Sequence, residues 1–319
     1  MKMLTRNETA EFLRRFDNYT ILTHRRPDGD TIGSAAGLCR ILRNLGKTAH
    51  VLANPEVTPK YQWLLEGLTK ETPQENDCII SVDVASPGML PEEYLPYLEQ
   101  IRLRIDHHGT ATSFTPYELV DAHAGACAEI IYDLGDLLPV PLDSATADAI
   151  YTATSTDTGC FRFPNTTDHT FTVAAACAAA GARVFQLNQI YFETNTFARL
   201  RIQSWIVEHL EFFNDGKIAL VAIPKSVEEE LGVTEDDMDN ISGFPRTIEG
   251  VCMAATLRHT KKGNVKLSLR AVPGWDASAV CARFGGGGHA GAAGATLYLP
   301  MEEAAQAVKT AINQLTVDN

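Results

Sequence analysis

The chain has 319 residues, of which 45% are hydrophobic and 21% are charged, and its formal net charge is −13. The length corresponds to about two domains of roughly 150 residues, and the apolar content is sufficient for folded cores. The negative charge argues against tight binding to long duplex nucleic acid. No apolar run approaches the roughly 20 residues that span a bilayer, and no secretion signal is visible. We therefore expect a cytoplasmic protein without a membrane partner.

Strand and helix patterns alternate through the first half of the chain. Strands are expected at 19–23, 49–53, 77–82 and 101–105. Helices are expected at 32–45, 125–138, 143–154 and 167–181, where apolar residues recur at helical spacing. This alternation is typical of an α/β domain with a mostly parallel sheet and helices on both faces. In such sheets, ligands bind beyond the carboxyl ends of the strands.

The pattern changes in the second half. A long helical stretch at 196–213 carries no catalytic-looking residue and is expected to act as a connector. The remaining pattern predicts strands at 217–223, 250–258, 264–271 and 294–299, and helices at 276–283 and 301–315. We therefore divide the chain into an N-terminal domain at 1–190, a helical linker at 191–215 and a smaller α+β domain at 216–319.

Aspartate and histidine side chains gather where the predicted strands and one helix end. In chain order they are His24, Asp28, Asp30, Asp83, Asp106, His107, His108 and Asp157. Each group has a structural alternative, since such aspartates also form turns and helix caps, and paired histidines also occur on surface loops. The histidine pair is the sharpest signal, because adjacent rings point in different directions and Asp106 can hold one imidazole N–H from behind.

Four aspartates and two histidines at the mouth of one sheet match the needs of two divalent cations. Without metal, four converging carboxylates would repel one another strongly, whereas two dications cancel their charge. The seven cysteines form no Cys-x-x-Cys pair, so the ligands are oxygen and imidazole nitrogen, which favours Mn²⁺ with Mg²⁺ as the alternative. Paired metals promote phosphoryl transfer, so the predicted reaction is hydrolysis of a phosphate ester or anhydride.

The second domain carries four consecutive glycines followed by a histidine. Glycine lets backbone N–H groups approach an anion closely, and the histidine would add a side-chain donor to a phosphate; a flexible surface loop is the alternative. Arginine side chains could clamp further phosphate oxygens, or could be solvated surface residues. The candidate substrate-binding residues are Gly286, Gly287, Gly288, His289, Arg270, Arg246 and Arg162.

Five motifs in this order resemble the DHH phosphoesterase superfamily with its associated C-terminal domain. They are HRRPDGDTIGS, SVDVAS, DHHG, TDTGCFRFPNTT and GGGGHAGAAG, and they run from His24 to Gly294. The compact two-domain layout resembles the RecJ-like nanoRNase and 3′-phosphoadenosine 5′-phosphate phosphatase group. It is also similar to phosphodiesterases that act on cyclic di-AMP or linear pApA.

The resemblance implies a role for each matching residue. One metal would be held by His24, Asp28 and Asp83, and the other by Asp30, Asp83, His107 and Asp157, with Asp83 bridging. His108 would lie next to the scissile phosphate as a proton donor or charge stabiliser, with Asp106 behind it. The N-terminal domain would be catalytic, and the C-terminal domain would close over the cleft and hold the substrate's far phosphate with its glycine run and His289.

These inferences predict a Mn²⁺-dependent hydrolase that releases 5′-mononucleotides from very short oligonucleotides, with 3′-phosphoadenosine 5′-phosphate as a further substrate. A cyclic di-AMP or pApA phosphodiesterase is the nearest alternative. A pyrophosphatase fits less well because related enzymes have another C-terminal domain, and a RecJ-type exonuclease would need additional nucleic-acid-binding modules. An inactive nucleotide-binding sensor is a distant alternative, since such a protein would normally have lost a metal ligand. Whether the protein forms a homodimer is left open.

Overall fold

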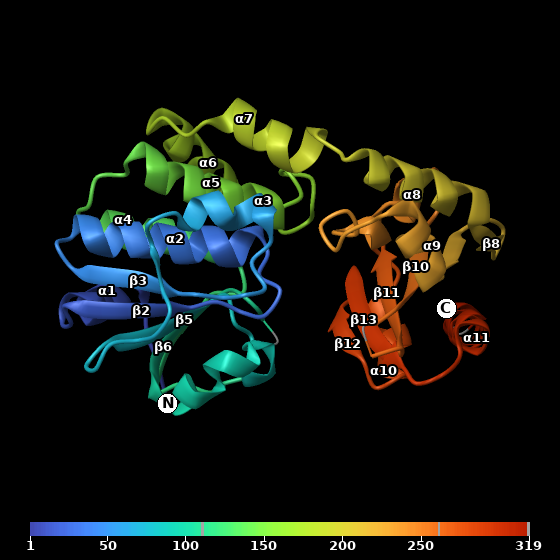
Figure 1. Ribbon diagram of the computed structural model, residues 1–319, viewed down its shortest axis with the longest axis horizontal. Helices are drawn as coiled ribbons and strands as arrows, with labels where there is room; N and C mark the ends of the chain where they lie inside the picture. The colour runs from blue at the N-terminus through green and yellow to red at the C-terminus, as the bar shows by residue number, and fades with distance from the viewer. Residues whose placement is uncertain (110–111, 261, 318–319) are drawn as a thin grey trace. The chain divides into compact units, whose positions relative to one another are not determined.

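The computed structural model describes residues 1–109, 112–260 and 262–317, and the chain divides after Thr194 into two compact units. Figure 1 shows the parallel strands and covering helices of unit 1, and the second sheet with its helices in unit 2. No helix within these described ranges is long and apolar enough to cross a membrane.

Unit 1 is built on a seven-stranded sheet in which neighbouring strands run parallel. The predicted parallel α/β architecture is therefore confirmed. The strand order is β1–β7–β6–β5–β2–β3–β4. The strands are β1 (Lys2–Met3), β2 (Asn18–Leu22), β3 (Thr48–Leu52), β4 (Thr69–Lys70), β5 (Cys78–Val82), β6 (Ile101–Asp106) and β7 (Tyr117–Val120).

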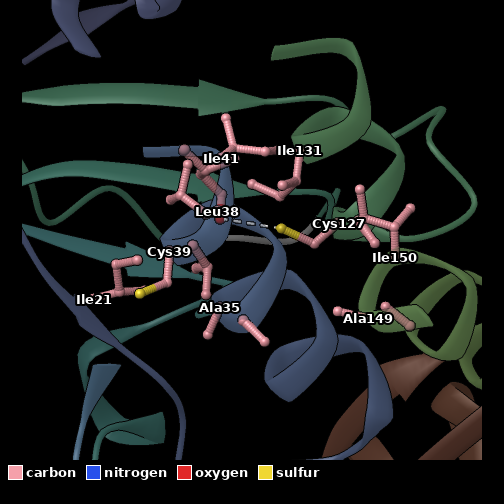
Figure 2. Packing of buried hydrophobic residues seen from close by; sticks show 14 of the residues in the cluster. Ile21, Ala35, Leu38, Cys39, Ile41, Cys127, Ile131, Ala149 and Ile150 are labelled. Atoms are coloured by element: carbon pink, nitrogen blue, oxygen red, sulfur yellow. Dashed lines mark hydrogen bonds between the residues drawn. The ribbon is translucent and has the colours of Figure 1, made fainter. Parts of the chain in front are cut away.

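Most helices of unit 1 share one core with the sheet. They are α1 (Arg6–Arg14), α2 (Gly29–Asn44), α3 (Pro59–Gln62), α4 (Cys127–Leu137), α5 (Ser144–Asp157), α6 (Asp168–Ala179) and α7 (Val184–Asn188). Figure 2 shows side chains of α2, α4 and α5 in this core, among them Leu38, Ile131 and Ile150. The other face of the sheet is covered by a 3₁₀ segment at Glu92–Gln100, whose buried Tyr94 donates a hydrogen bond to the carbonyl of Leu52 at 2.7 Å.

The strand order places the predicted site residues at one edge of the sheet. From β2, the chain adds β3 and β4 on one side and then β5, β6 and β7 on the other. The carboxyl ends of β2 and β5 therefore flank the point where the connections diverge, which is where ligands bind in open α/β sheets. His24 follows β2, Asp83 follows β5, and Asp106 ends β6, the next strand along.

Unit 2 contains a six-stranded mixed sheet in the order β12–β13–β11–β10–β9–β8. Its strands are β8 (Glu211–Phe213), β9 (Ile218–Ile223), β10 (Met253–His259), β11 (Val265–Ala271), β12 (Gly287–His289) and β13 (Ala292–Leu297). Its helices are α8 (Phe197–His209), α9 (Lys225–Leu231), α10 (Ala277–Ala282) and α11 (Met301–Val317). Helices α10 and α11 pack on one face of the sheet, and α8 packs on the other.

Two segments of unit 2 differ from the sequence expectation. The helix expected to extend to residue 213 ends at His209, and its Ile202 and Ile206 are fully buried in a core of unit 2 with Val221 of β9. The glycine run, where no strand was expected, enters strand β12, which pairs antiparallel with β13. Neither outcome is visible locally, because both depend on a sheet assembled from distant segments.

Helices α2 and α5 approach each other closely because α2 carries glycines on the contact face. A Cβ atom added to Gly33 would lie 2.4 Å from the carbonyl oxygen of Ala149 and 2.7 Å from Cβ of Ala153. A Cβ atom at Gly29 would lie 2.2 Å from Oγ1 of Thr156. This approach brings the start of α2, with Asp30, next to the end of α5, with Asp157.

Replacing Gly33 with alanine should lower the free energy of unfolding by about 1–3 kcal/mol, because the methyl group forces two helix backbones apart. Gly37→Ala is the matched control in the same helix, since its methyl group meets side chains and no backbone, with Ile150 at 3.2 Å and Ile131 at 3.5 Å. That variant should be neutral or up to about 1 kcal/mol more stable, because alanine favours helix interiors. Urea unfolding monitored by circular dichroism measures both, and equal stabilities would contradict this account of the packing.

Candidate metal centre

The first group of candidate ligands lies where β2 and β5 end. His24 Nε2 lies 3.6 Å from Asp83 Oδ2 and 3.9 Å from Asp28 Oδ1. Asp28 is also the N-cap of α2, where its Oδ1 accepts a hydrogen bond from the backbone N–H of Thr31 at 3.0 Å. The N-cap interpretation and the ligand interpretation of Asp28 are thus compatible, because one carboxylate has several lone pairs.

The second group surrounds the imidazole of His107. Its Nε2 lies 3.6 Å from Asp30 Oδ2, 3.6 Å from Asp83 Oδ1 and 3.8 Å from Asp157 Oδ2. Asp83 therefore contributes one oxygen to each group. Its backbone has φ = 57°, in the left-handed region that non-glycine residues rarely adopt, and such strain is common at functional sites.

The buried carboxylate of Asp30 is fixed by the amino end of α4. It accepts hydrogen bonds from the backbone N–H groups of Cys127 and Ala128 at 2.7 and 3.1 Å, and from Ser34 Oγ at 2.9 Å. The helix dipole of α4 also favours a negative charge at this end. These hydrogen bonds hold the Asp30 carboxyl group in a fixed orientation.

In two of the histidines, a hydrogen bond donated by Nδ1 turns the Nε2 atom toward the carboxylates. His24 Nδ1 lies 2.8 Å from the carbonyl oxygen of Arg25, and His107 Nδ1 lies 3.2 Å from that of Ala124. Because a carbonyl only accepts, each Nδ1 carries a hydrogen. In the neutral ring, Nε2 then presents its lone pair to the carboxylates, as a metal-ligating histidine requires.

His108 is held differently from His107. Its Nδ1 lies 2.8 Å from Asp106 Oδ1, whose oxygen also accepts the backbone N–H groups of His107 and His108. His108 Nδ1 is also 3.5 Å from Asp83 Oδ1, but a nitrogen that donates to Asp106 cannot ligate a cation. The His108 ring is therefore suited to touch a substrate with Nε2, and Asp106 is suited to orient it.

The electrostatics of the site show an excess of buried negative charge. Burial and the neighbouring Asp83 and Asp157 hold the pKa of Asp30 well above its usual value. Burial and repulsion from Asp28 and Asp83 raise the pKa of Asp157 to about 7. Burial alone would lower the pKa of His107, but the surrounding carboxylates, Asp30 foremost, raise it to about 9. Without a metal, this site therefore draws protons to compensate its carboxylates.

The donor set fits divalent cations. Three sets of ligand atoms each lie within 4.8 Å of one another: His24 with Asp28 and Asp83, His107 with Asp30 and Asp157, and Asp83 with His107 and His108. Asp83 Oδ1 is buried and accepts no hydrogen bond from the described residues, so this oxygen is available to a cation. Carboxylate oxygen with imidazole nitrogen and no thiolate is the chemistry of hard or borderline divalent ions.

The predicted substrate-binding residues of unit 2 lie partly together. His289 of β12 pairs with Ala292 of β13, which pairs with Arg270 of β11. Residues in register across neighbouring strands share one face of a sheet, so His289 and Arg270 project from the same face with the small Ala292 between them. Burial lowers the pKa of Arg270, and its Nη1 donates to the carbonyl of Leu269 at 3.0 Å.

The packing requires glycine at two of the three positions before His289 and not at the third. A Cβ atom at Gly286 would lie 2.2 Å from the carbonyl oxygen of Gly294, and one at Gly288 would lie 2.5 Å from that of Ala292. The close approach of β13 thus accounts for both. A Cβ atom at Gly287 would meet nothing within 4 Å, so packing does not require glycine there.

Two of the predicted substrate-binding arginines, Arg246 and Arg162, belong neither to the ligand groups nor to the His289–Arg270 pair. Arg246 lies in a 3₁₀ turn at Pro245–Thr247, and its side chain makes no hydrogen bond or ion pair within the described part of unit 2. Arg162 is exposed, and its Nε donates to the carbonyl of Gly159 at 2.6 Å. It lies in the turn that follows α5 and Asp157, and this backbone contact uses only its Nε.

Sequence reasoning missed several supporting residues. Thr31 Oγ1 donates to Asp83 Oδ2 at 2.6 Å, and Ser34 follows Asp30 by one helical turn, a spacing that the sequence displays. Asn165 Nδ2 donates to Asp157 Oδ2 at 3.2 Å and to the carbonyl of Gly125 at 2.7 Å. No local signal reveals this contact, because residues 159–161 all have positive φ and turn the chain back.

The comparisons with known proteins identify the family of this chain. Residues 18–154 match the model of the DHH family N-terminal domain, and residues 215–318 match the DHHA1 domain. A "bifunctional oligoribonuclease and PAP phosphatase NrnA" from Thermus thermophilus is 34% identical over 300 residues, covering 92% of this chain and 89% of the relative. The protein of the same name from Bacillus subtilis is 29% identical, covering 91% and 93%.

A solved structure supports the fold. The crystal structure of an exopolyphosphatase-related protein from Bacteroides fragilis has a TM-score of 0.83 and 24% identity, covering 97% of this chain and 95% of that one. Together with the 34% identity over nearly the whole length, the two family matches show that this chain belongs to the DHH family and carries a C-terminal DHHA1 domain.

Proposed function

We propose that this chain is a divalent-metal-dependent phosphoesterase that cleaves very short oligonucleotides to 5′-mononucleotides and removes the 3′-phosphate of 3′-phosphoadenosine 5′-phosphate. The observation that carries the chemistry is the convergence of His24, His107 and four aspartates at the edge of the parallel sheet. The substrate class is supported by the similarity to relatives that are named oligoribonuclease and PAP phosphatase and are matched over nearly their full length.

The proposed cofactor is a pair of Mn²⁺ ions, with Mg²⁺ as the alternative. His24, Asp28 and Asp83 would hold one ion, and Asp30, Asp83, His107 and Asp157 would hold the other. The chemistry that such ions supply is polarisation of the phosphoryl oxygens and a lowered pKa of the attacking water.

Two further residues of unit 1, His108 and Asp106, are assigned separate roles in the proposed reaction. His108, whose Nδ1 is held by Asp106, offers Nε2 to the leaving oxygen of the scissile ester as a proton donor or charge stabiliser. Its side chain is 28% exposed, which leaves it accessible to a substrate, whereas Asp106 is fully buried. Asp106 therefore orients the ring and does not meet the substrate.

The residues of unit 2 are proposed to bind a substrate phosphate. His289 is exposed on β12 and shares a sheet face with Arg270, so both can donate to phosphate oxygens. Gly287 is exposed and its glycine is not required by packing, which leaves its backbone accessible to an anion. Arg246 and Arg162 remain weaker candidates. The net charge of −13 favours short substrates over long nucleic acid.

A substrate panel tests this function. With Mn²⁺, the protein should hydrolyse pApA and other short oligonucleotides and 3′-phosphoadenosine 5′-phosphate, and EDTA should abolish all turnover. Asp83→Ala is the matched inactive variant, because Asp83 contributes to both ligand groups. Chromatographic product analysis should also include cyclic di-AMP, pyrophosphate and a 24-mer. Activity on pyrophosphate alone, a preference for the 24-mer, or a preference for cyclic di-AMP would contradict the assignment.

Metal binding should change the stability of unit 1. In metal-free protein at pH 8, Asp157→Asn should raise the thermal unfolding midpoint, because it removes one of the repelling carboxylates. Added Mn²⁺ should stabilise the unchanged protein, by about 2.7 kcal/mol at a hundredfold excess over the dissociation constant, and should stabilise Asp157→Asn less. Asp133→Asn is the control, since Asp133 pairs with Arg6 and His169 outside the site. An equal Mn²⁺-induced shift in Asp157→Asn would count against Asp157 as a ligand.

His289→Ala should raise KM for pApA about tenfold or more with a smaller change in kcat, because the lost contact is to a phosphate remote from the reaction. His209→Ala is the matched control, an exposed histidine of unit 2 that stacks on Trp205 and is absent from the proposed phosphate site. Steady-state kinetics with Mn²⁺ measure both variants. An unchanged KM in His289→Ala would remove this residue from the site.

A further inference from the structure

Arg104 is the largest fully buried side chain among the described residues, and the proposed reaction gives it no role so far. It lies on β6 two residues before Asp106 and is 1% exposed. A buried guanidinium loses its hydration, so its place in the fold requires compensating partners of good geometry. The contacts of the Arg104 guanidinium therefore indicate its role in the fold.

The first partner is Glu118, which pairs with Arg104 in register on the neighbouring strand β7. Arg104 Nη2 lies 2.8 Å from Glu118 Oε2. Glu118 also accepts hydrogen bonds from Ser113 Oγ and from the backbone N–H groups of Phe114 and Thr115. Although burial opposes it, these bonds and Arg104 lower the pKa of Glu118. Glu118 is therefore a fixed anion that anchors the guanidinium.

The second partner is Asp106. Arg104 Nη1 lies 3.5 Å from Asp106 Oδ2, an ion pair between two fully buried groups. This oxygen accepts no hydrogen bond from the described residues, whereas Oδ1 receives His108 Nδ1 and two backbone N–H groups. Arg104 is thus the cation that accompanies the Asp106 carboxylate on the side facing away from His108.

The third set of contacts joins two loops of the site. Arg104 Nη1 donates to the carbonyl oxygens of Ala85 at 3.2 Å and Thr112 at 3.3 Å. Ala85 follows Asp83 by two residues, and Thr112 lies in the loop after His108. The backbone N–H of Thr112 also donates to the Ala85 carbonyl at 2.8 Å, so the two loops are tied at this point.

We propose that Arg104 is a positioning residue for the reaction, which fixes His108 through Asp106 and ties the Asp83 loop to the loop after His108. This inference rests on the proposed function. A lysine cannot replace the arginine, because one ammonium group cannot reach Glu118, Asp106 and two carbonyls in the fixed geometry of a guanidinium.

The test compares Arg104→Lys with Arg183→Lys. Arg183 also pairs with a carboxylate in unit 1, since its Nε donates to Asp148 Oδ2 at 2.7 Å, but its side chain is more exposed and no described contact of it involves a proposed site residue. Arg104→Lys should reduce kcat on pApA about 100-fold with little change in KM, because small displacements of a catalytic group are costly. Its bound Mn²⁺ should be unchanged, and Arg183→Lys should keep full kcat. A second variant, Arg104→Met with Glu118→Gln, removes the buried charges in pairs should Arg104→Lys fold poorly.

A double-mutant cycle decides whether Arg104 acts through Asp106. In an Asp106→Asn background, Arg104→Lys should reduce kcat much less than it does alone, because the carboxylate that it holds is gone. A full additional loss in this background, or an equal loss of kcat in Arg183→Lys, would overturn the proposal.

A measurement without substrate separates this inference from the proposed function. The hydrogen-bonded Nδ1 proton of His108 should give a downfield NMR signal in the unchanged protein and in Arg183→Lys, and this signal should shift or disappear in Arg104→Lys. If the unchanged protein hydrolyses none of the panel, the proposed function fails while the NMR comparison still reports on Arg104. An unaltered His108 signal in Arg104→Lys would overturn the positioning role.

Discussion

Repulsion among buried carboxylates is the constraint on which the rest of unit 1 depends. Asp30, Asp83 and Asp157 lie around one imidazole, largely removed from water, and such a group is unfavourable unless positive charge accompanies it. The fold supplies partial compensation through the amino end of α4 at Asp30 and through His24 and His107. What these partners leave uncompensated is charge of the magnitude that divalent cations carry. The proposed divalent cations would supply the positive charge that this site lacks.

The same constraint explains the close packing of α2 against α5. Asp30 and Asp157 belong to different helices and can share a site only if the start of one helix approaches the end of the other. Gly29 and Gly33 permit this approach, since a methyl group at either would collide with α5. These glycines of the first motif therefore permit the helix contact that brings the candidate ligands together. The aspartates beside and between them, Asp28 and Asp30, supply negative charge to the site.

Much of this arrangement could be predicted, because ligand position follows from strand position. The alternating strands and helices of the first half imply a parallel sheet, and residues after its strands must share one edge, which located His24, Asp83 and Asp106. Short elements were not predictable, because β7 and β12 depend on pairing with distant strands. Arg104 was missed for the same reason. The run Ile101-Arg102-Leu103-Arg104 alternates as if both arginines faced solvent, and only the pairing with Glu118 on β7 makes burial of the second possible.

The adjacent histidines show how one short segment can support two kinds of chemistry. Their ring centroids are 4.7 Å apart. The group that accepts the Nδ1 hydrogen of His107 nevertheless differs from the group that accepts that of His108. A neutral carbonyl, that of Ala124, holds His107 and leaves its Nε2 among carboxylates, where the proposed cation would bind. A buried carboxylate, Asp106, holds His108, and a carboxylate stabilises the protonated ring in a way that a carbonyl cannot. The choice of acceptor thus separates the proposed metal ligation from the proposed proton transfer, and it depends on where the Asp106 carboxylate is held. The buried guanidinium of Arg104 lies 3.5 Å from Asp106 Oδ2 and 2.8 Å from Glu118 Oε2, and it thereby links that carboxylate to strand β7.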